Sequence, residues 1–217
     1  MIAFVTGATS GFGAAIARRF IRDGHRVIAA GRRRERLDEL RKELGTRLHP
    51  VELDVQDRAA VEAAFANLPA DFAAVDVLVN NAGLALGLQP AQAADLDDWD
   101  AMIDTNVKGL AYCSRATKAF VHHFSLNLRA DLLGTAVRVT DVQPGMCAGT
   151  EFSQVRFHGD AARAAKVYEG IEQPLTAEDV ADTVAWVVSR PAHLNVNSIE
   201  VMPVAQAINT FKFDRKT

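Results

Sequence analysis

The sequence predicts an α/β fold, a single domain over residues 1–217 in which a doubly wound parallel sheet is covered by helices on both faces. Short apolar runs alternate with stretches of helical periodicity, a pattern typical of parallel strands joined by crossover helices. The run Val75–Val79 is apolar and β-branched, which suits a strand buried on both faces. The length and a composition of 49% hydrophobic and 24% charged residues are ordinary for a globular domain with one core.

In the first half, four apolar runs are expected to form strands. They are Ile2–Val5, Val27–Ala30, His49–Leu53 and Val75–Val79. A stretch of helical periodicity follows each of them. These helices are expected at about Gly13–Arg22, Arg34–Leu44, Arg58–Asn67 and Leu96–Asn106. The first three end near Gly24, Gly45 and Pro69, which stop helices, and the fourth has the acidic first turn that favours a helix N-terminus.

In the second half, Val137–Val142 and Ser198–Met202 are expected to be strands, with a helix at Ala177–Ser189 between them. The residues from about 146 to 174 follow the first of these strands. They are expected to form a lid over the site, with Asp160–Lys166 as part of a mobile lid helix.

The segment Leu110–Leu133 does not fit this pattern. It contains no Gly or Pro, and large apolar residues recur every four positions from Phe120 to Leu132. Taken literally, it is one helix of about 36 Å, whereas helices average about 11–12 residues. The stretch resembles the front of one helix joined to the back of another.

The bulk properties exclude several classes of partner. A net charge of -3 gives no reason to expect nucleic acid or an anionic membrane. Cys113 and Cys147 are too few for a disulfide framework, which favours a reducing cytoplasm. A strand beginning at Ile2 leaves no room for a signal peptide, and no apolar run reaches bilayer length. We therefore expect a cytoplasmic protein without membrane partners, and we predict no metal site.

A glycine-rich turn lies between the first strand and the first helix. Glycines let the backbone turn tightly and approach a pyrophosphate, whose charge is stabilised at the helix N-terminus. A plain strand–helix turn is the alternative. The candidate cofactor-binding residues of this turn are Gly7, Ala8, Thr9, Ser10, Gly11, Phe12 and Gly13.

Arginines follow the second strand, where an NAD-binding domain usually offers an acidic residue to the ribose hydroxyls. Arg32 and Arg33 instead present guanidinium groups that can fork onto a 2′-phosphate, which favours NADP over NAD. The alternative is a solvated basic helix start, because Arg36 and Arg41 continue the same charged face.

Further candidates follow the third and fourth strands. Asp54 is placed to accept from an adenine amino group and Val55 to pack on the ring, although Asp54 as a helix N-cap is an equal alternative. Asn80-Asn81-Ala82-Gly83 lies beside the expected switch point of the sheet, where small residues allow close approach of a cofactor. A plain turn is the competing interpretation of this segment. The candidates in it are Asn81, Ala82 and Gly83.

Together these motifs resemble the short-chain dehydrogenase/reductase family. The residues that carry the resemblance are Thr6-Gly-x-x-x-Gly-x-Gly13, Asn80-Asn-Ala-Gly83, Asn106 and Pro144-Gly145, in register from Met1 to about Arg115 and from Ala116 to about Pro203. Gly83-Leu-Ala-Leu-Gly87 and the run Gly149–Phe157 resemble the subgroup of NADP-dependent 3-hydroxy acid dehydrogenases, which also act on serine-like amino acids and reduce malonic semialdehyde. The resemblance implies a Rossmann-like fold, a homotetramer and hydride transfer at the nicotinamide.

The family's proton-transfer residues are only partly present. In the family, a tyrosine acts as base beside a lysine that also holds the nicotinamide ribose, a serine binds the substrate oxygen, and an asparagine orders a relay water. The resemblance assigns Lys118 and Asn106 to the lysine and asparagine roles, although Lys118 also fits a surface helix lysine. The tyrosine position, four residues before the lysine, holds Ser114, and Tyr112 is turned about 240° away on a helix.

Three accounts of this gap are open. About thirty residues that form a helix–strand–turn unit with the serine and tyrosine belong between Arg115 and Ala116 but are absent from the sequence. Alternatively, the deletion is genuine and the strand Val137–Val142 moves next to Val75–Val79. The third account, convergence of an unrelated nucleotide-binding protein, is disfavoured because six motifs fall in the family's order. We favour the first on grounds of fold consistency.

The remaining candidates follow the later strand. The resemblance assigns Pro144, Gly145 and Thr150 to cofactor binding, with Thr150 bonding the carboxamide or a phosphate. Arg156 is a cation in the expected lid and a candidate to clamp a substrate carboxylate, although an ordinary surface arginine is as good an interpretation. The chain is therefore expected to be an NADP-dependent oxidoreductase of small 3-hydroxy acids. The alternative is a catalytically silent NADP-binding protein.

Overall fold

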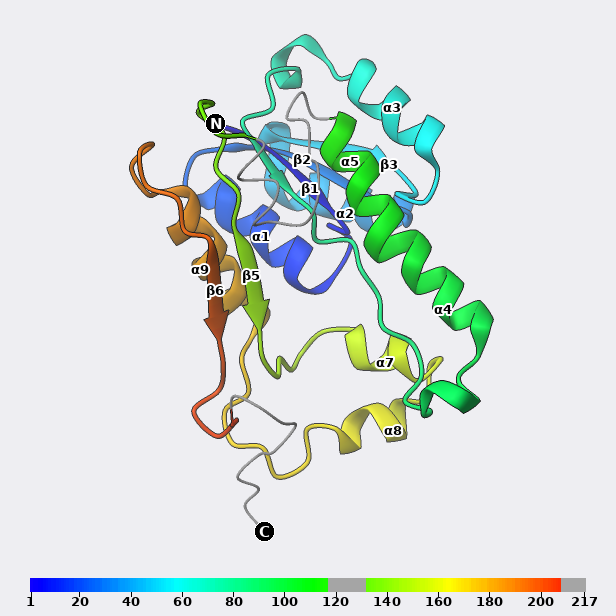
Figure 1. The fold of residues 1–217 in the computed structure, drawn as a ribbon. Helices are drawn as coiled ribbons and strands as arrows, with labels where there is room; N and C mark the ends of the chain where they lie inside the picture. The colour runs from blue at the N-terminus through cyan, green and yellow to red at the C-terminus, as the bar shows by residue number, and fades with distance from the viewer. Residues whose placement is uncertain (117–131, 208–217) are drawn as a thin grey trace.

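The computed structural model describes residues 1–116 and 132–207. Its main sheet has four parallel strands in the order β3-β2-β1-β4 (Figure 1). The strands are β1 (Ile2–Thr6), β2 (Arg26–Gly31), β3 (Leu48–Glu52) and β4 (Val77–Val79). The chain moves outward from β1 to β3 and then returns to place β4 on the other side of β1. All four strands lie where the sequence predicted them, within two residues at each end.

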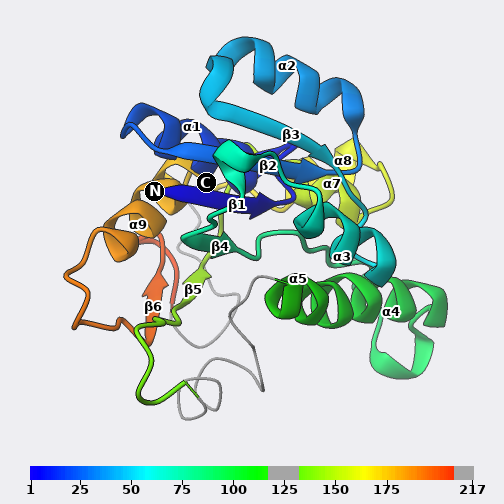
Figure 2. The ribbon, with the colours of Figure 1, turned by 90° about the horizontal axis from the view of Figure 1, so that it is seen from above.

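Helices cover both faces of this sheet (Figure 2). One face is covered by α1 (Gly11–Arg22) and α2 (Arg34–Leu44), and α9 (Ala177–Val188) packs against α1. The other face is covered by α3 (Arg58–Ala66) and α5 (Leu110–Ala116). The prediction of a doubly wound α/β fold is confirmed for this part of the chain.

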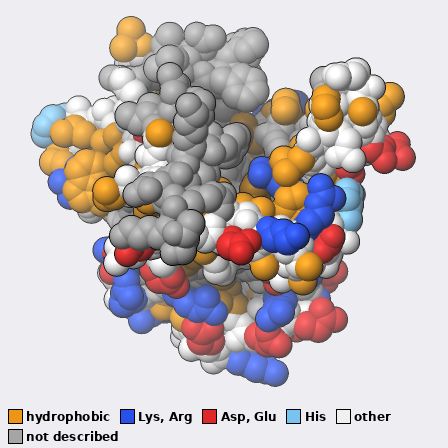
Figure 3. Space-filling view, turned by 90° about the horizontal axis from the view of Figure 1, so that it is seen from below, with side chains coloured by type: hydrophobic (Ala, Val, Ile, Leu, Met, Phe, Trp, Pro, Cys, Tyr) orange, Lys and Arg blue, Asp and Glu red, His pale blue; other side chains and the backbone are white. Residues whose placement is uncertain are grey.

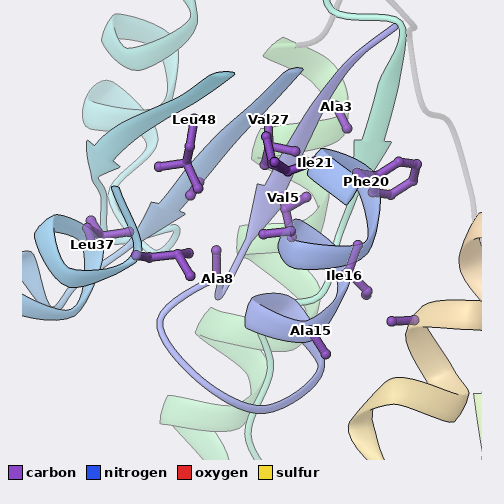
Figure 4. Packing of buried hydrophobic residues seen from close by; sticks show 14 residues of the cluster. Ala3, Val5, Ala8, Ala15, Ile16, Phe20, Ile21, Val27, Leu37 and Leu48 are labelled. Atoms are coloured by element: carbon purple, nitrogen blue, oxygen red, sulfur yellow. The ribbon is translucent and has the colours of Figure 1, made fainter. Parts of the chain in front are cut away.

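The core lies between the sheet and these helices. Strand residues such as Val5 and Val27 are fully buried and pack against Ile16 and Phe20 of α1 and Leu37 of α2 (Figure 4). A second cluster on the opposite face includes Phe4 and Val61. Alanines are common on the buried face of α1, and their small side chains let the helix lie close to the sheet. This close packing fixes the position of the turn that joins β1 to α1.

Two later strands form a separate parallel sheet. They are β5 (Asp141–Pro144) and β6 (Ser198–Val201), and they pair with each other rather than with β4. Among the described residues, β4 pairs with no strand besides β1. The deletion account predicted Val137–Val142 beside Val75–Val79, and this arrangement is not found.

The predicted strand Val137–Val142 is shifted toward the C-terminus for a local reason. The side chain of Asn195 accepts a hydrogen bond from Val139 N at 2.8 Å and donates to Val139 O at 2.9 Å. These bonds replace the ladder that a neighbouring strand would supply. Regular pairing therefore begins only at Asp141.

The predicted helix Leu96–Asn106 is two elements. The α-helix α4 (Leu96–Ile103) runs into a π-helix, η4 (Asp104–Gly109), and then into α5. The stretch Leu110–Leu133, expected to be the front of one helix joined to the back of another, is helical in α5 as far as Ala116; Leu132 and Leu133 lie outside any helix, and residues 117–131 lie outside the described residues.

Short 3₁₀ turns connect several elements, at η1 (Gly45–Arg47), η2 (Ala70–Phe72) and η3 (Ala91–Ala93). After β5, two short helices, α7 (Phe152–Arg156) and α8 (Ala161–Lys166), occupy the segment predicted as a lid, below the carboxyl ends of the strands in Figure 1. In the described parts of the chain, no helix combines the length and apolar character that a membrane span needs. On the face drawn in Figure 3, basic and acidic side chains are interspersed over the atoms that are not grey.

Candidate functional site

A cavity of about 330 Å³ opens at the carboxyl ends of the strands. It lies between β1 and β4, where the order in which the chain adds strands to the sheet reverses, the place at which ligands bind in open α/β sheets. The loops after β1, β2, β3 and β4 all contribute to it, together with the start of the lid. The predicted residues that line the cavity are Gly7, Thr9, Ser10, Gly11, Phe12, Arg32, Arg33, Asp54, Val55, Asn81, Ala82, Gly83 and Thr150.

The turn between β1 and α1 has a backbone conformation and close contacts that require glycine. Gly7 and Gly11 adopt positive φ angles of 64° and 50°. A Cβ on Gly13 would lie 2.3 Å from Gly7 O, so α1 packs directly on the turn. Ser10 is the N-cap of α1, and its side chain makes no capping hydrogen bond. The first-turn N–H groups of α1 are therefore oriented as an anion site requires.

Thr6 joins the loops after β1 and β4. Its Oγ1 accepts hydrogen bonds from Asn81 N at 3.0 Å and Ala82 N at 2.9 Å. In return, Asn81 Nδ2 donates to Thr6 O at 2.9 Å and to Gly7 O at 3.2 Å. Thr6 is almost fully buried, so it holds the two loops together without reaching the cavity. Thr6 belongs to the glycine motif without having been a predicted site residue, and its position at the end of a buried strand is the sequence signal for this structural role.

The far end of the cavity is lined by the residues after β2 and β3. Arg33 donates to Thr9 Oγ1 through Nη2 at 3.1 Å and to Glu151 Oε2 through Nη1 at 2.7 Å. Arg32 Nη1 lies 3.8 Å from Asp54 Oδ2. Both arginines face the cavity, whereas Arg34 turns back to Asp38 on α2.

The alternative that made Asp54 a helix N-cap is wrong. The cap of α3 is Asp57, whose side chain accepts from Ala60 N. Asp54 instead accepts from Gln56 N at 3.0 Å through Oδ1 and lines the cavity.

The asparagine of the predicted relay lies beside the loop after β4. Asn106 Oδ1 accepts from Leu84 N at 2.9 Å, and Asn106 Nδ2 donates to Leu84 O at 2.7 Å. The π-helix η4 carries Asn106, and its neighbour Thr105 accepts from Gln56 Nε2 at 2.7 Å. Asn106 is thus held in place, although it does not line the cavity. Lys118 lies outside the described residues.

Ser114 occupies the position where the family's tyrosine was expected. It is almost fully buried, and its Oγ accepts from Asn80 Nδ2 at 2.8 Å. A hydroxyl enclosed in this way cannot reach a substrate in the cavity. The base of the expected chemistry is therefore not supplied by Ser114.

Several predicted residues are not brought to the cavity. Ala8 is fully buried, and its N–H donates to Ala30 O at 2.9 Å, which ties the turn to β2. Gly13 lies behind the turn that it packs on. Pro144 ends β5, and Gly145 donates to Val201 O at 2.7 Å beside Gln206, away from the cavity.

Arg156 sits at the end of α7, one turn beyond Phe152, which does line the cavity. Its guanidinium stacks over the Phe152 ring with the central carbon 4.9 Å from the centroid. Among the described residues, its buried Nε has no hydrogen-bond partner. A buried donor without a partner is costly, and an anionic group would satisfy it.

The cysteine side chains do not provide a nucleophile. Burial raises the pKa of the Cys113 thiol to about 12. Burial and the nearby Asp179 carboxylate raise the pKa of the Cys147 thiol to about 11. Both thiols are therefore protonated at neutral pH, whereas a reactive cysteine must be a thiolate. In residues 1–116 and 132–207, no three His, Cys, Asp or Glu side chains gather as metal ligands.

The chain is similar to known dehydrogenases along nearly its whole length. The NADP-dependent 3-hydroxy acid dehydrogenase YdfG of Escherichia coli (strain K12) is 52% identical over 240 residues, covering 95% of this chain and 96% of the relative. Serine 3-dehydrogenase of Agrobacterium fabrum (strain C58 / ATCC 33970) is 44% identical and covers 98% of both chains. The alignment with the E. coli relative is longer than the 217 residues present here, so that relative contains residues without a counterpart in this chain.

Solved structures agree with the sequence relatives. A closed form of serine dehydrogenase complexed with NADP+ superposes with a TM-score of 0.92 at 50% identity and covers 100% of both chains. The serine dehydrogenase of Escherichia coli gives a TM-score of 0.80 at 44% identity, with 95% of this chain and 100% of that chain covered. The family model described as short chain dehydrogenase matches residues 1–117. The chain therefore belongs to the short-chain dehydrogenase family.

Proposed function

We propose that this chain binds NADP in the cavity at the carboxyl ends of β1–β4 and serves the interconversion of a small 3-hydroxy acid, serine-like or 3-hydroxypropionate-like, and its carbonyl form. The observation that carries the proposal is the pairing of a glycine turn with two cavity-facing arginines, Arg32 and Arg33. YdfG of E. coli is NADP-dependent and the closed form of serine dehydrogenase is complexed with NADP+, which supports the same cofactor here.

The residues that line the cavity fit NADP. A Cβ on Gly7 would lie 2.9 Å from the Cα of Ala82, and one on Gly31 would lie 2.6 Å from Thr9 Cγ2, so larger residues at these two positions would push apart the loops that line the cavity. The free N–H groups at the start of α1 suit a pyrophosphate. Leu53, Asp54 and Val55 border the cavity near the arginines, where an adenine would lie. When bound, the nicotinamide supplies hydride transfer.

The chain's own contribution to chemistry depends on residues outside this cavity. Asn106, held by Leu84, is the proposed anchor of a relay water, and Lys118 is the proposed ribose-binding lysine. A phenol or comparable base is also needed to take the alcohol proton. Within residues 1–116 and 132–207, one side of β4 has no partner strand, which supports the account in which a helix–strand–turn unit with this base belongs after Arg115.

An alternative function is that of an NADP-binding protein without turnover. The burial of Ser114 supports it for the chain of 217 residues. We further propose, from the family relationship, a homotetramer in the cytoplasm.

Titration of the purified protein with NADPH, followed by fluorescence, tests the proposal. Saturable binding, much tighter than that of NADH, is expected. Lack of binding at millimolar NADPH would refute it. Intact mass then separates the two functions: 23.5 kDa with no turnover of NADP and L-serine supports the silent protein, whereas a mass about 3 kDa higher with turnover supports the active enzyme.

We propose that Arg156 binds the substrate carboxylate. Its buried Nε without a partner and its position next to Phe152 at the cavity support this role. Replacing Arg156 with Gln is expected to weaken binding of a 3-hydroxy acid to the NADP-loaded protein about tenfold, because one charge-assisted hydrogen bond is lost. Calorimetry measures this binding without requiring turnover.

Arg163 provides the matched control for this substitution. It is also an arginine of the lid and also stacks on an aromatic ring, that of Phe157, at 4.8 Å. Arg163→Gln is expected to leave binding of the hydroxy acid unchanged. Equal effects of the two substitutions would show that Arg156 has no specific role.

A further inference from the structure

The guanidinium of Arg33 has partners on two sides. On one side, Nε and Nη2 donate to Thr9 Oγ1 at 3.3 and 3.1 Å, and Nη2 also lies 3.3 Å from Thr9 O. On the other side, Nη1 donates to Glu151 Oε2 at 2.7 Å. Thr9 thus fixes the plane of the guanidinium, and the Glu151 carboxylate, at the start of the lid, accepts the hydrogen bond from Nη1.

Arg32 differs from Arg33 in this respect. Among the described residues, the carboxylate oxygen nearest to the Arg32 guanidinium is Asp54 Oδ2, which lies 3.8 Å from Nη1 and beyond hydrogen-bonding distance. The Arg32 side chain is also 65% exposed, compared with 42% for Arg33. An incoming phosphate can therefore reach Arg32 directly, whereas Arg33 can fork onto it only if Glu151 leaves.

Glu151 is positioned to meet such a phosphate. It lines the same cavity as Arg32 and Arg33. It follows Thr150, whose side chain would be 3.4 Å from a Cβ on Gly11, so the start of the lid lies against the glycine turn. A carboxylate at this place repels a second anion. NAD carries no 2′-phosphate and leaves the ion pair undisturbed.

We propose that Glu151 competes with the 2′-phosphate of the cofactor for Arg33 and so sets how strongly the site prefers phosphorylated over unphosphorylated adenosine. This inference rests on the proposed NADP site. The 2′-phosphate displaces the carboxylate because it carries more charge and three acceptor oxygens. Binding of NADP then includes the cost of breaking the Arg33–Glu151 pair.

The expected size of the effect follows from exposure. Both side chains of the pair are about two-fifths exposed, at 42% and 38%. Solvated ion pairs of this kind change an equilibrium by a factor of roughly 1.4 to 5. Glu151→Gln keeps the shape of the side chain and removes its charge, so it is expected to tighten binding of the 2′-phosphate about two- to fivefold.

The test uses 2′-AMP and 5′-AMP as probes in calorimetric titrations. These ligands lack the nicotinamide half of the cofactor, so the measurement requires no turnover. Glu151→Gln is expected to strengthen binding of 2′-AMP and to leave that of 5′-AMP unchanged. Glu39→Gln is the control, because it removes one charge from α2 at an exposed residue that pairs with Arg36 rather than Arg33.

A double-mutant cycle separates competition from a general change in charge. In an Arg33→Gln background, Glu151→Gln is expected to have no further effect on 2′-AMP. Unchanged or weakened binding of 2′-AMP in Glu151→Gln would overturn the inference and leave the NADP site standing. An equal gain in Glu39→Gln would also overturn it. Failure of the unmodified protein to bind 2′-AMP would overturn both the inference and the proposed function.

Discussion

Replacing Gly13 with alanine is expected to abolish binding of NADPH and to lower the free energy of unfolding by about 1–3 kcal/mol. A Cβ at this position would lie 2.3 Å from Gly7 O and 2.5 Å from Asn81 Nδ2. Neither neighbour can move away easily, because Asn81 Nδ2 donates to both Thr6 O and Gly7 O. The methyl group therefore pushes the glycine turn away from α1, and the cavity loses the backbone that faces the pyrophosphate.

The measurement combines chemical denaturation with an NADPH titration. Gly24→Ala is the control: Gly24 also has a special conformation, with φ of 89°, but a Cβ there would meet nothing within 4 Å. It is expected to cost about 1 kcal/mol through backbone strain and to leave NADPH binding intact. Normal affinity in Gly13→Ala would mean that the turn does not contact the cofactor.

The parts of the site that the sequence predicted are those that depend on local structure. The glycine turn follows directly from a strand, a tight turn and a helix, and Arg32 and Arg33 follow directly from the end of β2. Because the carboxyl ends of parallel strands meet at one edge, placing each strand was sufficient to place these residues in one cavity.

Contacts between residues far apart in the chain could not be predicted from the sequence. Nothing near Val139 shows that Asn195 would take both of its backbone groups and shorten the predicted strand. The partnership of Glu151 with Arg33 likewise joins residues 118 positions apart. Pro144 and Gly145 were assigned by family position, but without a strand pairing with the free side of β4 among the described residues, β5 lies in a separate sheet.

One end of the site is therefore formed by the described residues, whereas the other lacks part of what the proposed reaction needs. The end proposed to bind adenosine and pyrophosphate is formed mainly by the loops after β1–β4 and is supported by buried hydrogen bonds, such as those of Thr6. The proposed proton-transfer end depends on the roles proposed for Asn106 and Lys118 and on a base that Ser114 does not provide. Binding experiments at the first end are therefore interpretable whatever the state of the second.

Replacing Arg32 and Arg33 together with Gln is expected to weaken NADPH binding about 100-fold, because two charge-assisted contacts to the 2′-phosphate are lost. Binding of NADH is expected to change less than about twofold, since that cofactor has no 2′-phosphate for the two arginines to contact. Arg36→Gln is the control: Arg36 lies on α2, which follows the two arginines, and pairs with Glu39, but it does not line the cofactor cavity.

The ratio of the two affinities is the informative quantity in this experiment. A variant that is merely misfolded loses NADPH and NADH together, whereas loss of the phosphate contacts lowers affinity for NADPH alone. Raising the salt concentration is expected to weaken NADPH binding to the unmodified protein more than to the double variant, because screening acts on the charges that the variant lacks. Parallel losses of both cofactors in Arg32→Gln/Arg33→Gln, with unchanged stability, would show that the arginines do not select the phosphate and would return them to an exposed basic start of α2.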